Sequence, residues 1–325
     1  MNGLDIITFG RACIDLNSVE INVPMEKTKT FAKYVGGSPA NIAIGCANLG
    51  LNVGFIGKLS SDQHGRFINN YLMKKKINTN GIVWDRDNHK SGLTFTEILS
   101  PEECSIMMYR QKVADLFIKP SELDEDFIKT TKMVLISGTS LCSSPSRETA
   151  LKLIEICEEN FIEVIFELDY RPYNWKNELE TSIYYNLVAS HSRIIIGTRD
   201  EFDKIFIKNK YSDLEIAEYF LNRNSHLVVI KHGEKGSKAF LKDGTIFESG
   251  IFKTKVLKTF GAGDSFASGF LYGYITNQTI MKSLIIGSAA AAIVVSSHSS
   301  SESMPTLEKI KEFIKLNEGE KNEVN

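Results

Sequence analysis

Cysteine is scarce and scattered in this sequence. The five cysteines are Cys13, Cys46, Cys104, Cys142 and Cys157. They are odd in number and nowhere form a C-x-x-C pair, which excludes a disulfide framework and a cysteine-based zinc cluster. Free thiols of this kind are typical of a reducing compartment, so we expect a cytoplasmic protein.

Long apolar runs and an excess of charge of one sign are also missing. The longest apolar stretch, residues 284–295, is too short to cross a bilayer and predicts a buried helix. Lysine and arginine number 38 against 40 acidic residues, a net charge of −2. Such a balance gives no broad attraction to nucleic acid or anionic membranes. The N-terminal residues lack the form of a signal peptide. We therefore expect neither nucleic-acid nor membrane partners.

Two common phosphate-binding motifs do not occur. The chain has no G-x-x-x-x-G-K-[ST], which excludes a P-loop, and no G-x-G-x-x-G opens its first strand–helix unit. A nicotinamide-dependent oxidoreductase of the usual dinucleotide-binding type is therefore disfavoured.

Short, continuous apolar runs alternate with helical patterns along the chain. The expected strands are 6–9, 53–56, 133–136, 164–168, 194–196 and 227–230. The expected helices are 38–50, 65–75, 146–160, 213–222 and 264–274. Continuous apolar strands with helices between them indicate an α/β fold whose mostly parallel sheet is covered on both faces.

Two regions break this rhythm. Residues 21–34, and 93–99 with 106–109, alternate as half-exposed antiparallel strands do, and S-P-E-E at 100–103 supplies a hairpin turn. We expect one domain over 1–325 with a β lid from about 17–35 and 91–112, and a frayed tail at 317–325. An apolar lid face of Ile106, Met108 and Phe95 offers a possible homodimer contact.

Polar residues follow several expected strands, where ligands bind in such sheets. Asp15 follows the first strand, and G-G-S-P-A-N places Gly36, Gly37 and Asn41 at a helix start. Paired glycines with an amide suit a polyhydroxylated ligand, although a helix start with an early proline is an equally good interpretation. Further strand-end candidates are Arg171 as an anion clamp, Thr198 and Glu201 beside a metal and phosphates, and the glycine turn Gly233 and Gly236.

The stretch K-T-F-G-A-G-D, residues 258–264, carries the chemistry. The backbone N–H groups of Gly261, Ala262 and Gly263 at a helix start would form an anion hole. Asp264 would then accept the proton of an attacking hydroxyl during phosphoryl transfer. The alternative, which these residues alone leave open, is that Asp264 is only the N-cap of the helix.

G-G-S-P-A-N at 36–41 together with T-F-G-A-G-D at 259–264 resembles the paired signatures of the ribokinase-like (PfkB) carbohydrate kinase family. The resemblance runs over essentially the whole chain. Longer blocks, such as F-E-L-D-Y-R-P-Y and S-G-L-T-F-T-E-I-L-S-P-E-E-C-S-I-M-M-Y-R, are similar to family members that phosphorylate a sugar acid of myo-inositol catabolism.

This resemblance implies a three-layer αβα sandwich with a β-sheet lid, ATP as phosphoryl donor and Mg²⁺, and it leaves open activation by a monovalent cation such as K⁺. Asp264 would be the base, and Asp15, Gly36, Gly37 and Asn41 would hold substrate hydroxyls. The implied nucleotide-side residues are Thr198, Glu201 (which also organises Mg²⁺ through water), Lys231, Gly233, Gly236 and Thr259.

A sugar acid also needs a cation for its carboxylate. Tyr109 and Arg110 at the lid end, with Arg171 opposite, are the candidates, although Arg110 could instead pair with Asp115. The chain departs from the family pattern at Lys258, where an aspartate is usual, and at Thr198, where an asparagine is usual. Kinases for 2-keto-3-deoxygluconate or fructose, and a non-catalytic sensor of sugar or nucleotide, are the alternative functions.

Overall fold

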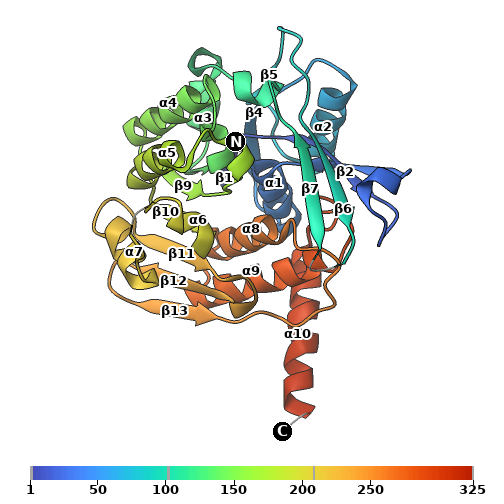
Figure 1. The fold of residues 1–325 in the computed structure, drawn as a ribbon. Helices are drawn as coiled ribbons and strands as arrows, with labels where there is room; N and C mark the ends of the chain where they lie inside the picture. Colours follow the sequence, from blue (N-terminus) through green and yellow to red (C-terminus); the bar gives the residue numbers. More distant parts are fainter. Residues whose placement is uncertain (1–2, 101–102, 208, 324–325) are drawn as a thin grey trace.

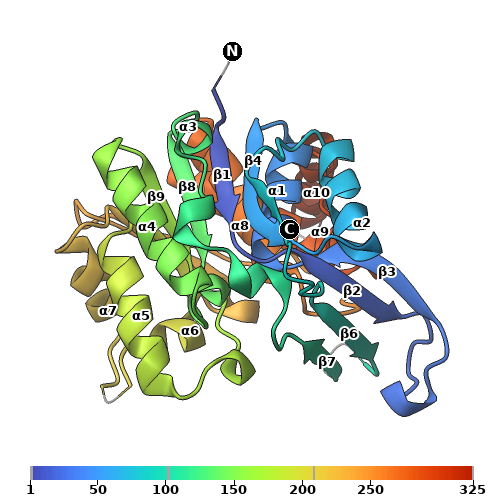
Figure 2. The ribbon, with the colours of Figure 1, turned by 90° about the horizontal axis from the view of Figure 1, so that it is seen from above.

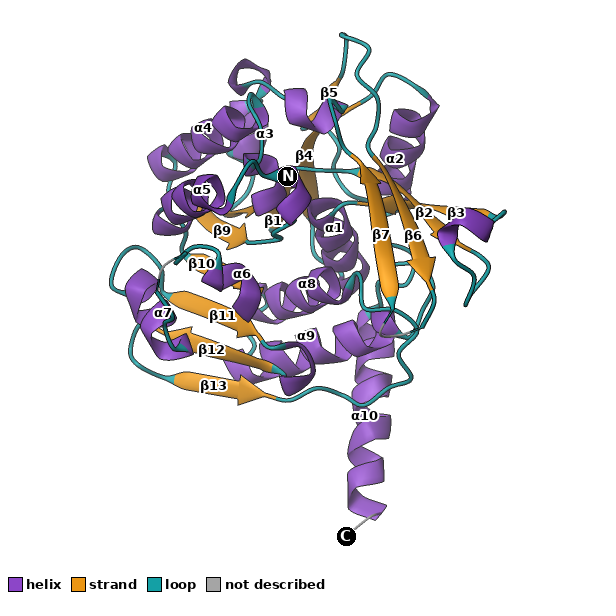
Figure 3. Cartoon of the chain, viewed as in Figure 1, coloured by secondary structure: helices purple, strands orange, loops and turns teal. Residues whose placement is uncertain are grey.

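A large central sheet forms the middle of the molecule. The computed structural model describes residues 3–100, 103–207 and 209–323. Within those ranges nine strands follow the order β13-β12-β11-β10-β9-β8-β1-β4-β5 (Figures 1 and 3). The strands from β11 to β5 pair in parallel, and β12 and β13 extend the sheet in antiparallel fashion. Their bounds are β1 Ile6–Phe9, β4 Val53–Leu59, β5 Ile82–Trp84, β8 Met133–Ser137, β9 Glu163–Glu167, β10 Ile194–Thr198, β11 Leu227–Lys231, β12 Ser237–Leu241 and β13 Ile246–Ser249.

Both faces of this sheet are covered by helices. In β10, Ile195 belongs to one apolar core, while Ile194 and Ile196 belong to the other, and all three are fully buried. The first core includes residues of α4, α5 and α7, and the second includes residues of α1, α2, α8 and α9, which Figure 2 shows on opposite sides. The prediction of a mostly parallel sheet buried on both faces is confirmed.

The five helices predicted from the alternating pattern agree with the observed ones to within two residues at each end, and several further helices were not predicted. The α-helices are α1 Ser38–Leu49, α2 Gln63–Lys74, α3 Glu125–Ile128, α4 Ser146–Glu159, α5 Glu178–Ser190, α6 Arg199–Asp203, α7 Asp213–Leu221, α8 Ala262–Ile275, α9 Ile280–Val295 and α10 Leu307–Glu323. The tail 317–325 was predicted to fray. Residues 317–323 form the end of α10, and 324–325 lie outside the described residues. Among the described residues, no helix is both long and apolar enough to span a membrane.

A second, four-stranded sheet stands beside the central one. Its order is β3-β2-β6-β7, with β2 and β6 parallel and the other pairs antiparallel. The bounds are β2 Cys13–Ser18, β3 Phe31–Gly36, β6 Leu93–Ile98 and β7 Cys104–Tyr109. The predicted hairpin is the β6–β7 pair, although 101–102 of its turn lie outside the described residues. We call this sheet the lid.

The predicted strand over 21–34 is wrong in its first part. Asn22 has a positive φ of 64°, and a short 3₁₀ turn occupies Met25–Lys27 directly after Pro24. Proline cannot donate to a β ladder, and a left-handed residue ends an extended segment. The strand therefore begins only at Phe31.

The three residues of the predicted apolar lid face do not lie on one face of the lid. Phe95 pairs with Met107, and Thr96 pairs with Ile106, so Phe95 and Ile106 point to opposite sides. The Phe95 ring lies 5.3 Å from Phe31 and 5.8 Å from Tyr109, between ring centroids, on the outer face. Ile106 and Met108 line the cavity described below. A contact between two lids would therefore use the outer face around Phe95.

His298 ties the lid to the C-terminal part of the chain. Its Nε2 lies 2.6 Å from the Ser18 carbonyl, and its Nδ1 lies 3.2 Å from the Tyr34 hydroxyl. Because a carbonyl can only accept, Nε2 carries the proton and Nδ1 accepts from Tyr34. The His298 carbonyl accepts a third bond, from Asn17 Nδ2 at 2.8 Å. Strands β2 and β3 are thereby fixed relative to the segment after α9.

Helix α8 packs against α9 at unusually short range. A Cβ at Gly269 would lie 2.8 Å from the Ile286 carbonyl oxygen and 3.0 Å from Gly287 Cα. These are backbone atoms, which cannot move aside by a rotamer change. Close packing at Gly269 therefore sets where the N-terminus of α8 lies.

We expect Gly269→Ala to lower the free energy of unfolding by about 1–3 kcal/mol, because the overpacking outweighs the roughly 1 kcal/mol that alanine gains in a helix. Urea unfolding measures this. Gly250→Ala is the control, since a Cβ there meets nothing within 4 Å. Equal stability of the two variants would contradict the packing account.

Candidate functional site

Four neighbouring strands of the central sheet each end on a polar residue. Ser137, Glu167, Thr198 and Lys231 are the last residues of β8, β9, β10 and β11. Ser137 stands beside Glu167 in the register, and Thr198 stands beside Lys231. The prediction that functional groups follow the strand ends thus leads to one edge of the sheet.

Helix α8 brings its N-terminus to this region. Gly261 precedes the helix with a φ of 86°, and a Cβ there would lie 2.5 Å from Ser300 Oγ. A left-handed conformation and this close contact both require glycine. The helix begins at Ala262, so the N–H groups of its first turn lack intrahelical partners. Asp264 lies inside the helix, and the N-cap is Gly261, so the N-cap interpretation of Asp264 is wrong.

A cavity opens in front of Asp264, between α8, α1 and the lid. Its lining residues are Arg11, Asp15, Gly37, Ser38, Asn41, Thr94, Thr96, Ile106, Met108, Arg171, Phe260, Gly261, Asp264 and Ser300. Asn41 Nδ2 donates to Asp264 Oδ2 at 2.8 Å, which fixes the carboxylate. Asn41 Oδ1 is buried without a hydrogen-bond partner among the described residues. One amide thus orients Asp264 and keeps an acceptor for a ligand hydroxyl.

Asp15 lies on β2 of the lid and projects into the same cavity. A Cβ at Gly36 would lie only 2.1 Å from the Asp15 carboxylate, and one at Gly37 would lie 2.4 Å from the Arg11 carbonyl. The G-G pair therefore lets β2 and β3 come together around this carboxylate. Burial raises the pKa of Asp15, although Arg11 acts to lower it.

Lys231 and Glu167 form a buried ion pair beneath α8. Lys231 Nζ lies 3.6 Å from Glu167 Oε1, and Ser38 Oγ donates to Glu167 Oε2 at 3.1 Å. A Cβ at Gly263 would lie 3.2 Å from Lys231 Nζ, which places the ammonium beside the helix N-terminus. Burial raises the pKa of Glu167; Lys231 opposes this shift, and nearby Asp169 and other carboxylates add to it.

Glu201 is held by backbone groups of two segments. It closes the capping box of α6, where Thr198 N–H donates to Oε2 at 2.7 Å, and Tyr170 N–H donates to Oε1 at 3.0 Å. The segment after β9 is thereby joined to the segment after β10. In that first segment Arg171 Nη2 lies 2.8 Å from Asp169 Oδ1. The side chain of Arg171 is about two-fifths exposed and reaches the cavity.

The remaining nucleotide-side candidates lie outside the cavity lining. Gly233 and Gly236 shape the turn between β11 and β12 with φ values of 58° and 89°. A Cβ at Gly233 would meet nothing within 4 Å, so this turn has open space beside it. Thr259 is exposed directly before the α8 turn. These positions leave a surface beside Lys231 on which a ligand can lie.

The structure does not bring Tyr109 and Arg110 into the cavity. Tyr109 is 56% exposed on the outer lid face. Arg110 Nη2 donates to Asp115 Oδ2 at 2.8 Å and to the Thr139 carbonyl at 2.9 Å. The pairing with Asp115 that the sequence left open is therefore the one observed. Of the three carboxylate candidates, Arg171 alone lines the cavity.

Sequence reasoning missed several residues at this site. Arg11 lines the cavity, and Glu167 and Asp169 stand with Lys231 at the strand ends. The signal for Glu167 was available, because a charged residue interrupts the apolar run V-I-F-E-L. Arg11 also comes shortly after an expected strand, 6–9, but the local sequence does not distinguish it from an ordinary turn residue.

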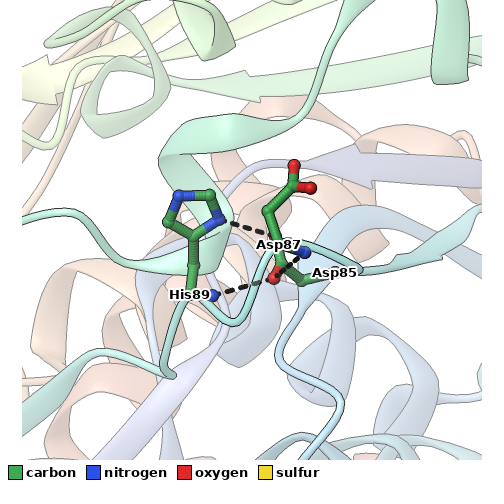
Figure 4. A group of neighbouring side chains, drawn as sticks. All are labelled: Asp85, Asp87 and His89. Atoms are coloured by element: carbon green, nitrogen blue, oxygen red, sulfur yellow. Dashed lines mark hydrogen bonds and ion pairs between the residues drawn. The ribbon is translucent and has the colours of Figure 1, made fainter.

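A separate group of possible metal ligands, Asp85, Asp87 and His89, lies on the loop after β5 (Figure 4). The buried Asp85 carboxylate accepts from the backbone N–H groups of Asp87 and His89, at 3.0 and 2.9 Å, and contacts His89 Nδ1 at 2.8 Å. The His89 ring also stacks on Phe117 at 3.7 Å between centroids. These contacts account for the group as a structural turn.

Comparison with known proteins identifies the family of this chain. Residues 4–307 match the family described as pfkB family carbohydrate kinase. A 5-dehydro-2-deoxygluconokinase of Bacillus subtilis is 57% identical over 310 residues, 95% of each chain. One of Listeria monocytogenes is 58% identical over the same length and shares.

A solved structure gives the same fold at lower identity. The fructokinase with bound ATP from Xylella fastidiosa has a TM-score of 0.86 at 22% identity and covers 97% of this chain and 99% of its own. The family predicted from the paired glycine motifs is confirmed. This chain therefore belongs to the pfkB family of carbohydrate kinases.

Proposed function

We propose that this chain catalyses the ATP-dependent phosphorylation of the 6-hydroxyl of 5-dehydro-2-deoxy-D-gluconate in myo-inositol degradation. The products are 6-phospho-5-dehydro-2-deoxy-D-gluconate and ADP. The observation that carries the chemistry is the Asp264 carboxylate on the first turn of α8, facing a cavity lined by hydrogen-bonding groups. The substrate follows from relatives of that name at 57–58% identity over 95% of the chain.

Proton transfer is assigned to Asp264. Its carboxylate accepts the proton of the 6-hydroxyl, whose oxygen attacks the γ-phosphorus while the bond to the ADP oxygen breaks. Asn41 holds the carboxylate at 2.8 Å, so it need not reorient during the reaction. The N–H groups of Gly261, Ala262 and Gly263 stabilise the negative charge on the transferring group.

Asp15 and Asn41 hold the substrate hydroxyls. Asp15 offers carboxylate oxygens that accept from hydroxyls, and the unpartnered Asn41 Oδ1 accepts another. Ile106 and Met108 of the lid cover the cavity with apolar groups, which limits water near the transferring phosphoryl group.

The nucleotide is placed on the strand-end side of α8. Lys231 beside Gly263 supplies a cation for its phosphates, Thr198 and Thr259 offer hydroxyls, and the Gly233–Gly236 turn leaves space for the adenosine part. A structural neighbour of the same fold carries bound ATP.

The carboxylates on that side fit Mg²⁺. Burial raises the pKa of Glu167, and the nearby carboxylates of Asp169, Glu201 and Asp264 raise it further. Carboxylates that repel one another in this way are suited to a hard dication and its water shell. When bound, Mg²⁺ would neutralise phosphate charge; Glu201, fixed by two backbone N–H groups, would hold one of its water ligands.

Lys258 holds the loop in front of the anion hole. The side chain is fully buried; its Nζ donates to the Phe260 carbonyl at 2.7 Å and lies 3.4 Å from Ser300 Oγ. Burial lowers the pKa of Lys258 to about 8, although Asp15 and Asp264 act to raise it. The ammonium therefore positions the turn at Gly261 through the backbone and Ser300.

A substrate panel with an ADP-release assay tests the proposed function, run with Mg²⁺ and both with and without K⁺. We expect kcat/KM for 5-dehydro-2-deoxy-D-gluconate to exceed that for 2-keto-3-deoxygluconate and for fructose. Fructose turnover equal to or faster than that of the keto acid would overturn the substrate assignment. Binding of sugar or ATP without any turnover would indicate a sensor.

Replacement of Asp264 by asparagine tests the base. Because the amide keeps the size and the contact to Asn41 but cannot take a proton, we expect kcat to fall by about 10²–10⁴-fold with ATP affinity little changed. Asp200→Asn is the control, since Asp200 also lies in the first turn of a helix but is exposed. Single-turnover rates and calorimetric ATP titration make the comparison, and unchanged turnover in Asp264→Asn would refute the assigned mechanism.

The Lys258 ammonium predicts opposite effects of alkaline pH on activity and stability. As pH rises through about 8 the amine loses its proton, so kcat should fall on an alkaline limb with an apparent pKa near 8. Stability should rise over the same window, from about pH 8 to the usual lysine pKa near 10.4, because the unfolded chain binds more protons there.

Lys258→Met should remove both pH effects and lower kcat, whereas Lys255→Met, at an exposed position, should keep them. Pairs of kcat–pH profiles and of unfolding free energies at pH 7.5 and 10 provide the measurement. An alkaline limb that persists in Lys258→Met would assign it to another group.

A further inference from the structure

Arg11 places a buried positive charge in the same cavity as Asp264. It lies in the turn between β1 and β2, is 6% exposed, and lines the cavity together with the candidate base. A fixed positive charge beside a catalytic carboxylate is not needed for binding sugar hydroxyls. A ligand with an anionic group would balance this charge.

The guanidinium of Arg11 is poorly satisfied by the protein itself. Its Nη1 donates to the thioether sulfur of Met108 at 3.0 Å, and sulfur is a weak acceptor. Its Nε is buried without a hydrogen-bond partner in the described part of the chain. Within the same residues, Arg11 has no carboxylate oxygen within 4.0 Å, whereas Arg110 and Arg171 each have one.

The charge of Arg11 is nevertheless retained. Burial acts to lower its pKa, but Cys13, Asp169, Asp115 and Asp15 together keep that pKa above its usual value. A buried cation without a close anion is costly, and a carboxylate that accepts two parallel N–H bonds would remove that cost. The aspartates therefore favour the charged form of Arg11 without forming a close ion pair with it.

In the proposed substrate the carboxylate and the hydroxyl that is phosphorylated lie at opposite ends of the molecule. Its carboxylate is carbon 1 and the phosphorylated hydroxyl is on carbon 6, so binding of one end at Asp264 leaves the other to reach a different wall. Arg11 on the β1–β2 turn, with Arg171 also on the lining, supplies the cations of this cavity. Fructose has no group that would pair with them.

We propose that Arg11 is the residue that binds the substrate carboxylate and so selects a sugar acid over a neutral ketose. The inference rests on the proposed function and deepens it. Arg11 takes the role that the sequence suggested for Tyr109 and Arg110. Met108 of β7 contacts the same guanidinium, so carboxylate binding and lid position are coupled through this contact.

Steady-state kinetics of Arg11→Met and Arg11→Lys test the proposal. For 5-dehydro-2-deoxy-D-gluconate we expect Arg11→Met to raise KM by about 30-fold or more with kcat changed much less, as expected when one partner of a buried charged pair is lost. The KM of Arg11→Lys should lie between those of the wild type and Arg11→Met, because lysine keeps the charge but cannot donate two parallel hydrogen bonds to a carboxylate. Arg86→Met, at an exposed arginine, is the matched control.

Arg110→Met provides the competing arm. A KM increase in Arg110→Met with none in Arg11→Met would overturn the inference, and so would equal KM values for Arg11→Met and the wild type. If Arg11→Met does not fold, inhibition of the wild type decides. D-gluconate should compete with substrate far better than neutral D-glucitol, and Arg11→Lys should narrow that gap; equal inhibition by the two would contradict the proposal.

Failure of the proposed function gives a different result. In that case the wild-type protein would not prefer the keto acid in the substrate panel. If the wild type does prefer it, and the Arg11 variants keep that preference unchanged, the function stands and only the role of Arg11 is overturned.

Discussion

Burial of the central sheet on both faces determines where this protein can carry polar groups. The inner strands alternate between two apolar cores, as Ile194, Ile195 and Ile196 do, so an unpaired polar side chain within such a strand would lose its hydration. Several polar residues accordingly lie where a strand ends and the helical layers no longer enclose it. Glu167 and Lys231, at two such ends, are nearly buried and hold each other at 3.6 Å. The position of α8 over these ends turns one edge of the sheet into a site.

The balance of charge across that edge follows from the cost of burying ions. Asp169 is held by Arg171, and Asp115 by Arg110, at 2.8 Å each, so these pairs compensate within the protein. The Glu167–Lys231 pair is longer, and other carboxylates lie near enough to raise the pKa of Glu167 further, so Lys231 alone does not balance the negative charge there. Arg11 is compensated only at a distance. The protein itself thus leaves charge unbalanced at two places, negative around Glu167 and positive at Arg11.

The sequence predicted what depends on neighbours along the chain and failed where distant contacts decide. The G-A-G-D turn and G-G-S-P-A-N both led to the cavity, because a left-handed glycine before a helix has a local signature. The lid faces were assigned wrongly because alternation of apolar residues along each strand defines two faces but does not show which residues of β6 and β7 share a face. Only the cross-strand register, in which Phe95 pairs with Met107, decides that. Arg11 was missed for the same reason, since its contact with Met108 joins residues 97 positions apart.

One short segment contacts both the lid and the turn that precedes α8, and this links the positions of the two. His298 binds the lid through the Ser18 carbonyl and Tyr34, and Ser300, two residues later, lies against Gly261 and Lys258. A displacement of β2 would therefore pull on the segment that supports the first turn of α8. Asp15 and Asp264 would move with those two elements, so the distance between their carboxylates depends on the 298–300 segment. A fixed conformation of residues 298–300 is therefore needed to hold both sides of the cavity in place.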